Sequence, residues 1–208
     1  MSVKIRTLPS GVPGLDEVLG GGIPELSFNL VVGGPGCGKT TLAHQIAFAN
    51  ASPKSRVLYI SIIGEPPLKM LRYQQQYAFF DPKKVGAAVT FLHLGDDAQE
   101  GGLGRVLDRI RDAVDRINPR VVVVDSFRSI FRAPLDASAT DNQDFIQRLA
   151  LHLTSCQATT FLIGELENSE QDSPVFTVAD GIISLQQAVD RNSVVRKLQV
   201  LKMRGQGQ

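Results

Sequence analysis

The chain has 208 residues, of which 43% are hydrophobic and 21% are charged, and its formal net charge is +1. These values exclude a disordered or fibrous protein and leave enough chain for one substantial core, so we expect a single domain over residues 1–208. The near balance of charge argues against nucleic-acid binding, because a nucleic-acid-binding surface is expected to be strongly cationic.

Apolar runs rich in β-branched residues alternate along the chain with longer stretches of helical periodicity. The predicted strands, in chain order, span residues 28–33, 57–62, 89–92, 121–125, 159–164, 181–185 and 194–203. The predicted helices span 39–50, 67–79, 103–117 and 142–155, and irregular segments are expected at 96–102, 133–141 and 166–175. This alternation predicts an α/β fold with a central, mainly parallel twisted sheet between two layers of helices.

The first predicted strand leads through a glycine-rich loop into a helix. Residues 33–40 read GGPGCGKT and match the phosphate-loop pattern GxxxxGK[ST]. The glycines let successive backbone N–H groups point at phosphate oxygens, and the N-terminus of the next helix adds partial positive charge. Lys39 would contact the β- and γ-phosphates, and the Thr40 hydroxyl would ligate Mg²⁺. We therefore expect ATP and Mg²⁺ to bind here, through Gly33, Gly34, Pro35, Gly36, Cys37, Gly38, Lys39, Thr40 and Thr41.

Three carboxylates follow predicted strands. Asp125 ends a run of four valines, and a magnesium site of this class needs a carboxylate at the end of a neighbouring buried strand, so we expect Asp125 to be a second-sphere ligand of Mg²⁺. Hydrolysis also needs a group that orients or deprotonates the attacking water, and Glu65 is the candidate base. The alternative for Glu65 is an exposed acid before a turn set by two prolines. Glu165 could sense the γ-phosphate or position water.

The other thiol and imidazole groups do not suggest a second site. Cys37 and Cys156 are assigned to no metal-ligand spacing, and the scattered His44, His93 and His152 are expected to have packing or surface roles. Two cysteines and no apparent secretory signal favour a reducing, cytoplasmic setting. The longest apolar runs are far shorter than the roughly 20 residues that cross a bilayer, so no membrane span is expected.

The ends of the chain extend this picture. Residues 8–25, LPSGVPGLDEVLGGGIPE, together with VADGIISL at 178–185 and LQVLKMRGQG at 198–207, resemble the KaiC-like branch of the RecA-type ATPases over nearly the whole chain. The resemblance implies a short helix bearing Leu15 and Asp16 before the phosphate strand. It also implies a hexameric ring with ATP bound between subunits, in which Lys202 and Arg204 reach the γ-phosphate held by the neighbour. As an isolated basic strand, the same two residues would simply be exposed.

Three departures from that family pattern affect what the resemblance implies. KaiC proteins carry two adjacent glutamates after the second strand, and here the pair reads Gly64-Glu65, which puts the hydrolysis rate in question but leaves nucleotide binding intact. Relatives continue past the Lys-Met-Arg-Gly sequence, which predicts a shortened C-terminus here and weaker ring formation. KaiC clock proteins have two such domains, so autokinase activity is not implied.

The leading hypothesis is therefore a slowly hydrolysing ATPase that acts as an oligomeric, nucleotide-dependent switch, with a protein partner that the sequence does not identify. The first alternative is a RadA- or RecA-like DNA-binding ATPase. Acidic residues in the segment 166–175 (Glu167, Glu170 and Asp172) argue against it, whereas Arg128 and Arg132 keep it open. The second alternative is a nucleotide-gated scaffold without meaningful turnover, which Gly64 motivates.

Overall fold

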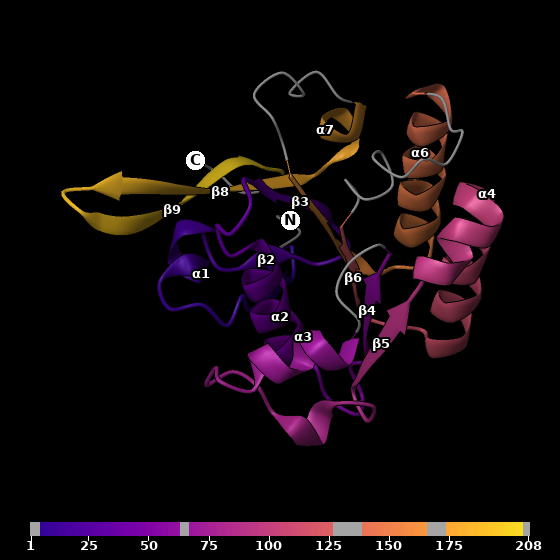
Figure 1. The fold of residues 1–208 in the computed structure, drawn as a ribbon, viewed down its shortest axis with the longest axis horizontal. Coiled ribbons are helices and arrows are strands. Elements are labelled where there is room, and N and C mark those ends of the chain that lie inside the picture. Colours follow the sequence, from indigo (N-terminus) through magenta and orange to yellow (C-terminus); the bar gives the residue numbers. More distant parts are fainter. Residues whose placement is uncertain (1–4, 63–66, 127–138, 166–173, 206–208) are drawn as a thin grey trace.

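The computed structural model of the protein describes residues 5–62, 67–126, 139–165 and 174–205 (Figure 1). The strands form a large central sheet, and a separate sheet of two short strands pairs β1 (Thr7–Leu8) with β2 (Ile23–Pro24). No helix in the described ranges combines the length and the apolar character that crossing a membrane requires.

The central sheet contains seven strands. Every neighbouring pair is parallel except the last, which is antiparallel. The strands, in their order across the sheet, are β5 (Val89–His93), β4 (Val57–Ser61), β6 (Val121–Asp125), β7 (Thr159–Gly164), β3 (Phe28–Gly33), β8 (Gly181–Asp190) and β9 (Ser193–Met203). The predicted α/β architecture with a mainly parallel sheet is confirmed.

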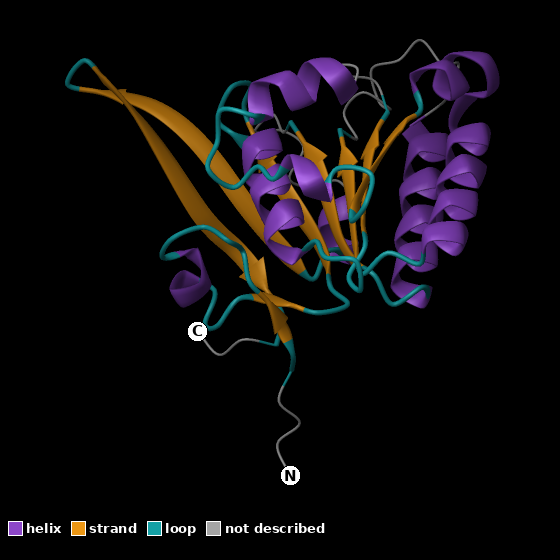
Figure 2. Ribbon diagram, turned by 90° about the horizontal axis from the view of Figure 1, so that it is seen from below, coloured by secondary structure: helices purple, strands orange, loops and turns teal. Residues whose placement is uncertain are grey.

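Helices cover both faces of the sheet and create two hydrophobic cores (Figure 2). One core is closed by α4 (Gly95–Ile117), α6 (Ala139–Ser155) and α7 (Pro174–Val178), and the other by α1 (Leu15–Val18), α2 (Lys39–Asn50) and α3 (Pro67–Gln74). In β6, Val122 and Val124 enter the first core while Val121 and Val123 enter the second, because side chains alternate along a strand. Each buried valine contributes about 1.5–3 kcal/mol, so this run strongly favours a strand covered on both faces.

Helix α4 begins at Gly95, well before the predicted start at residue 103, so the expectation of an irregular segment at 96–102 is wrong. The helix contains one non-helical residue, Gly102 (φ 64°, ψ −161°), which joins two helical parts across a kink. The first part is stabilised because Asp97 accepts a hydrogen bond from Arg105 Nε at 2.9 Å and Ala98 is buried in the core. Neighbouring glycines hid this part from the sequence pattern.

Helix α3 ends at Gln74, earlier than the predicted end at residue 79. The chain then makes a tighter turn, in which the Tyr77 N–H donates to the Gln74 carbonyl at 3.0 Å. This turn lets the rings of Phe79 and Phe80 pack against Phe48, with centroids 6.2 and 5.1 Å away. Aromatic packing with α2 therefore replaces the last turn of the predicted helix. A short 3₁₀ helix, η1 (Pro82–Lys84), follows.

Strands β8 and β9 form a hairpin that extends well beyond the body of the protein (Figures 1 and 2). The sequence predicted that the first strand would end at residue 185, but it continues to Asp190. The turn residues Arg191 and Asn192 both have positive φ, 47° and 66°, which suits the twist of a two-residue hairpin turn. The outer half of β8 is exposed on both faces, so it lacks the apolar alternation by which strands are predicted.

Two other predicted segments are only partly described. Helix α6 starts at Ala139, so residues 139–141 of the predicted irregular segment 133–141 are helical and the rest lies outside the described residues. Of the predicted irregular segment 166–175, residues 166–173 lie outside the described ranges, and α7 begins at Pro174. The short helix implied at Leu15 and Asp16 is present as α1, and Asp16 Oδ1 accepts a hydrogen bond from the Ser10 N–H at 2.8 Å.

Candidate phosphate-binding site

The glycine-rich loop connects β3 to α2 at the C-terminal end of the parallel strands. Gly33 has φ 149°, and a Cβ at this position would lie 2.0 Å from the Leu185 carbonyl oxygen of β8. Helix α2 starts after Gly38, whose φ is 101°, and no side chain caps its first turn. The first N–H groups of a helix need partners, so this uncapped N-terminus is suited to an anion such as phosphate.

Lys39 lies inside the loop rather than on the surface, with a relative exposure of 8%. Its Nζ donates hydrogen bonds to the carbonyl oxygens of Gly33 at 2.9 Å and Gly34 at 2.6 Å, and lies 3.8 Å from Cys37 Sγ. Cys37 is itself buried and packs against the core. The loop therefore surrounds the ammonium group of Lys39, which points toward the centre of the loop.

Asp125 meets the loop across the sheet. The Thr40 hydroxyl donates to Asp125 Oδ2 at 2.8 Å, although the two residues are 85 positions apart in the chain. The Tyr59 hydroxyl, from β4, donates to the same oxygen at 2.7 Å. Burial raises the pKa of the Asp125 carboxyl, while the hydrogen bonds from Tyr59 and Thr40 and the charge of Lys39 act in the opposite direction. Burial, with Asp125 as a neighbour, also raises the pKa of Tyr59.

Tyr59 was not anticipated as part of the site. It is a large, fully buried side chain in an apolar strand, and its ring packs with those of His44 and Phe91. Its polar hydroxyl is the feature that could have drawn attention to it, because a buried tyrosine hydroxyl usually has a hydrogen-bond partner. In this protein that partner is the carboxylate predicted to hold Mg²⁺.

A cavity of about 300 Å³ opens between the loop and the ends of β6 and β7. Lys39, Thr40, Asp125 and Glu165 all line it, together with Ser126. Four residues that the sequence singled out separately are therefore brought together around one small space. The peptide bond between Asp125 and Ser126 is cis.

A larger cavity of about 860 Å³ borders the loop between β3, β8, β9 and α7. Its described walls carry the polar side chains Ser184, Gln186, Gln187 and Gln199, but no lysine, arginine, aspartate or glutamate. A triphosphate carries several negative charges, so it is better matched by the smaller cavity, where Lys39 and the helix N-terminus supply positive charge.

Lys202 and Arg204 lie away from the small cavity. Lys202 pairs across the hairpin with Ile182, near the start of β8, whereas Gly33 pairs with Leu185 farther along that strand. Lys202 Nζ donates to the Phe176 carbonyl at 3.3 Å. Arg204 Nη1 forms an ion pair with Asp180 Oδ1 at 3.2 Å, and the Arg204 side chain is 62% exposed. Neither cation is among the residues that line the small cavity.

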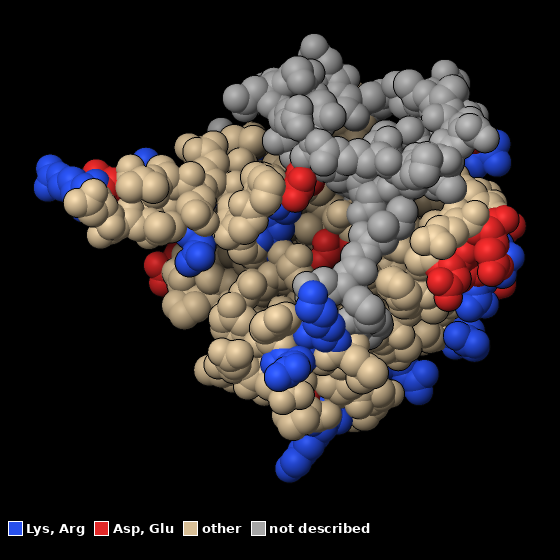
Figure 3. All heavy atoms as spheres, in the orientation of Figure 1, with Lys and Arg blue, Asp and Glu red and all other residues tan. Residues whose placement is uncertain are grey.

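The candidate base Glu65 lies outside the described residues, as does Gly64. Arg128, Arg132 and the three acidic residues of the segment 166–173 also lie outside them. On the face drawn in Figure 3, the lysine and arginine side chains of the described residues are scattered rather than gathered into one patch.

Comparison with known proteins shows similarity along nearly the whole chain. A family model described as "ATPase: KaiC" matches residues 8–208. The chain is 26% identical over 225 residues to a UPF0273 protein of Methanopyrus kandleri, covering 98% of this chain and 85% of the relative. It is 29% identical over 159 residues to the DNA repair protein RadA of Chlamydia pneumoniae, covering 75% of this chain and 32% of RadA.

The fold has a close counterpart among solved structures. The crystal structure of a KaiC-like protein from Pyrococcus horikoshii superposes with a TM-score of 0.82 at 25% sequence identity. The match covers 97% of this chain and 90% of the other. The arrangement of strands and helices around the loop is therefore shared with that protein.

Proposed function

The chain belongs to the KaiC ATPase family, and on that premise we propose that it binds ATP with Mg²⁺ at residues 33–41 and hydrolyses ATP slowly. The hydrogen bond from Thr40 to Asp125, at 2.8 Å, carries this proposal. It joins the end of the phosphate loop to the end of a different strand, so hydroxyl and carboxylate oxygens converge beside a buried lysine. This is the set of groups that binding a nucleoside triphosphate and its metal ion requires.

Each group in the cavity has a distinct task. The uncapped N–H groups of α2 and the loop amides bind phosphate oxygens, and Lys39 exchanges its carbonyl partners for the β- and γ-phosphates. Thr40 and Asp125 fit Mg²⁺, because this ion prefers oxygen ligands and keeps several of its waters: the Thr40 hydroxyl would bind the ion directly, and Asp125, which accepts the Thr40 hydrogen bond, would act from the second coordination sphere. When bound, Mg²⁺ neutralises negative charge on the β- and γ-phosphates. Tyr59 holds Asp125 in place from the neighbouring strand β4.

Water activation is assigned to two carboxylates, Glu65 and Glu165. We propose that Glu65 is the base. We propose that Glu165, which lines the cavity, positions water or senses the γ-phosphate.

Glu65→Gln should abolish turnover while ATP binding is retained, because glutamine cannot accept the proton. Single-turnover hydrolysis measured beside ATP binding checks this, with Glu165→Gln in parallel. Unchanged turnover in Glu65→Gln would show that Glu65 is not the base. A wild-type protein that binds ATP without turnover would instead favour the scaffold alternative.

The ring is the second part of the proposal. Lys202 and Arg204 do not line the cavity of their own subunit, which supports a role at the nucleotide of a neighbour. A positive side chain supplied in this way stabilises charge that develops on the transferred phosphoryl group. We propose a homohexamer with ATP at its subunit interfaces, whose nucleotide state switches its shape or its protein partner.

Isothermal titration calorimetry with Mg-ATP tests the nucleotide site directly. We expect one site per chain in the wild type and an affinity about 10- to 100-fold lower in Lys39→Ala, which loses charge-assisted hydrogen bonds worth about 1.5–3 kcal/mol. The matched control is Lys54→Ala, because Lys54 is an exposed lysine outside the loop. No heat from ATP or GTP with folded wild-type protein would contradict the proposal.

A second candidate function is binding of single-stranded DNA, which the similarity to the DNA repair protein RadA favours. The scattered positive charge on the face in Figure 3 and the overall charge of +1 count against it. Fluorescence anisotropy with a single-stranded oligonucleotide, with and without Mg-ATP, separates the two functions. ATP-dependent binding that weakens as salt rises would support the DNA function, and no binding at low salt would exclude it.

A further inference from the structure

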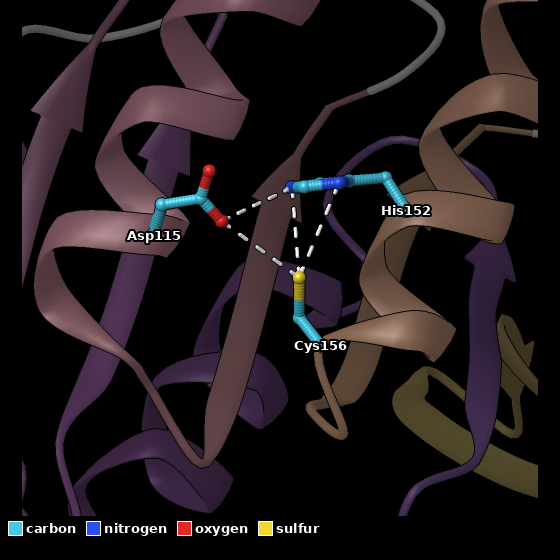
Figure 4. Close-up of side chains that lie close together, drawn as sticks. All are labelled: Asp115, His152 and Cys156. Carbon is cyan, nitrogen blue, oxygen red and sulfur yellow. Dashed lines mark hydrogen bonds and ion pairs between the residues drawn. The ribbon is translucent and has the colours of Figure 1, made fainter.

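Three side chains with metal-ligating atoms meet between the C-terminal ends of α4 and α6. Asp115 lies in the last turn of α4, His152 lies in the last turn of α6, and Cys156 follows α6 directly (Figure 4). Cys156 Sγ lies 3.7 Å from His152 Nε2 and 4.0 Å from its Nδ1, and Asp115 Oδ1 lies 4.0 Å from both His152 Nε2 and Cys156 Sγ. Among the described residues this is the one group of three that could hold a metal ion.

The sequence analysis expected packing or surface roles for His152 and Cys156, and the structure places both beside Asp115. The two residues are four positions apart, and the Cys156 N–H donates to the His152 carbonyl at 3.0 Å, so the helical path places both side chains on one face. That spacing is the feature that could have revealed the pair in the sequence. Asp115 comes from a distant part of the chain and needed the structure, because the packing of α4 against α6 brings it into place.

The geometry differs from that of a nucleophilic triad. In a Cys-His-Asp triad, the thiol and the carboxylate contact different nitrogens of the imidazole. Here Cys156 Sγ and Asp115 Oδ1 both approach Nε2 of His152, at 3.7 and 4.0 Å. Figure 4 shows the carboxylate oxygen reaching one ring nitrogen, Nε2, and the sulfur reaching both nitrogens, with Nε2 the nearer. Atoms that converge on one point in this way surround a shared ion better than they relay a proton.

The distances suit a small tetrahedral ion. Zinc bonds of about 2.3 Å to sulfur and about 2.0 Å to nitrogen and oxygen place neighbouring ligand atoms roughly 3.3–3.6 Å apart. The observed separations of 3.7–4.0 Å therefore need to shorten by only a few tenths of an ångström. Cys156 Sγ is also 4.0 Å from Nδ1, so the imidazole must turn to aim Nε2 at the ion, and this terminal torsion is soft.

The surroundings also favour a cation. The partial negative charges of two helix C-termini point toward the cluster, and positive charge is stabilised at such ends. A thiolate and a carboxylate would together neutralise a divalent ion, and a thiolate with an imidazole selects zinc over magnesium or calcium. Asp115 is 68% exposed and His152 is 17% exposed, so solvent can reach the ion and supply the fourth ligand.

We propose that Asp115, His152 and Cys156 bind a zinc ion that connects the C-terminal ends of α4 and α6. The ion completes its coordination with water. It binds the folded chain and not the unfolded one, so it stabilises the packing of the two helices. These helices lead into β6 and β7, and Asp125 and Glu165 lie at the C-terminal ends of those strands. The zinc site therefore lies near the N-terminal ends of the strands, and the phosphate loop lies near their C-terminal ends.

Cobalt(II) is the spectroscopic probe for this site. Metal-free, reduced protein titrated with CoCl₂ should develop a thiolate-to-cobalt charge-transfer band and the intense visible bands of tetrahedral cobalt, with an end point of one equivalent. One equivalent of ZnCl₂ should then remove both sets of bands. The charge-transfer band should vanish in Cys156→Ser and persist in Cys37→Ser. The absence of the band in the wild type, or its loss in Cys37→Ser instead, would overturn the proposal.

Ligand substitutions measured by competition with a zinc indicator give a second test. Substituting groups that merely support a zinc ligand costs about 10- to 100-fold in affinity, so removing a direct ligand in His152→Ala or Asp115→Asn should cost at least about that much. His93→Ala and Asp112→Asn are the matched controls, because both residues are exposed and outside the cluster. ZnCl₂ should also raise the Tm of the wild type but not that of His152→Ala. Equal zinc affinity in ligand and control variants would refute the assignment.

Discussion

Asp125 shows how the candidate site is held at the scale of single residues. Burial is the largest influence on its carboxyl and raises its pKa above the ordinary value of 3.8, despite hydrogen bonds from Tyr59 and Thr40 and the nearby charge of Lys39. An ionised carboxylate at this position therefore costs folding free energy at neutral pH. The position is explained by function rather than stability, because the charge faces the cavity in which we propose that Mg²⁺ binds.

Asp125→Asn should accordingly stabilise the protein at neutral pH and weaken Mg-ATP binding. Below about pH 3.8 the carboxyl is protonated whether the chain is folded or unfolded, so variant and wild type should have similar stability. As the pH rises from 3.8 to the raised pKa, the unfolded chain loses the proton first, and the wild type loses about 1.4 kcal/mol per pH unit relative to the variant. Urea unfolding at several pH values measures this, with surface Asp108→Asn as control. A constant difference at all pH values would contradict it.

Tyr59→Phe should destabilise the protein, because it removes the 2.7 Å hydrogen bond to Asp125 and leaves the ring packing in place. The expected loss at pH 7 is about 1.5–3 kcal/mol, the usual range for a hydrogen bond to a charged group. Because that bond lowers the pKa of Asp125, the loss should shrink in acid, where the carboxyl is neutral. The half-exposed Tyr77 provides the control Tyr77→Phe, which should change the unfolding free energy little. Equal effects of both substitutions would rule out the assigned role of Tyr59.

At the scale of elements, the phosphate loop depends on a close approach between β3 and β8. The Cβ of an alanine at position 33 would lie 2.0 Å from the Leu185 carbonyl oxygen and 2.9 Å from Cys37 Sγ. At Gly34, one residue farther along, nothing lies within 4 Å of an added Cβ. The two neighbouring glycines therefore serve different purposes, since only the first must be a glycine for packing.

Gly33→Ala should lower the free energy of unfolding by about 2 kcal/mol or more, because the backbone of β8 must move and the left-handed φ disfavours a side chain. Gly34→Ala should change stability by less than about 1 kcal/mol in either direction. Chemical denaturation of both variants without nucleotide isolates the effect on folding from the effect on binding. A Gly33→Ala variant as stable as Gly34→Ala would mean that the loop does not need the close contact between β3 and β8.

The elements differ in how far their sequences determine them. Strands β3, β6 and β7 and helix α2 begin and end at the predicted residues, because each is buried on two faces or bounded by glycines. The outer part of β8 and the first part of α4 were missed, since cross-strand pairing and a salt bridge stabilise them rather than apolar periodicity. The site residues differ in the same way. Asp125 is indicated by a local sequence pattern, whereas the contacts of Tyr59 and Asp115 are made with residues distant in the chain and depend on the fold.

At the scale of the whole molecule, the two halves of the proposed catalytic machinery lie apart. The cavity that contains Lys39 is formed at the C-terminal end of the parallel strands, whereas Lys202, near the end of the antiparallel edge strand β9, and Arg204, just after it, lie toward the other end of β8. Arg204 is exposed and held by Asp180, whose carboxylate also accepts a hydrogen bond from the Phe28 N–H at 3.0 Å. Within the described residues of a single chain, Lys39 is therefore not brought together with Lys202 and Arg204.

Mixing two inactive variants tests whether the cations act between subunits. Arg204→Ala and Lys39→Ala should each lack hydrolysis, but a one-to-one mixture should recover activity at roughly a quarter of the interfaces, where an intact Lys39 faces an intact Arg204. Steady-state phosphate release from the mixture, reassembled with Mg-ATP, is the measurement. A mixture of Lys39→Ala with Thr40→Ala should stay inactive, since both substitutions damage the same cradle. Equal recovery in both mixtures, or none in the first, would contradict action between subunits.

The separation of Lys39 from Arg204 gives the molecule a polarity. Any contact that joins the cradle of one copy to the edge strand of the next uses two unlike surfaces, so copies must add head to tail. An open filament built in this way always leaves one terminal cradle without its cation pair, whereas a closed assembly leaves none. Closing the ring would then complete the last cradle, and dilution, which separates the copies, would act as an inhibitor.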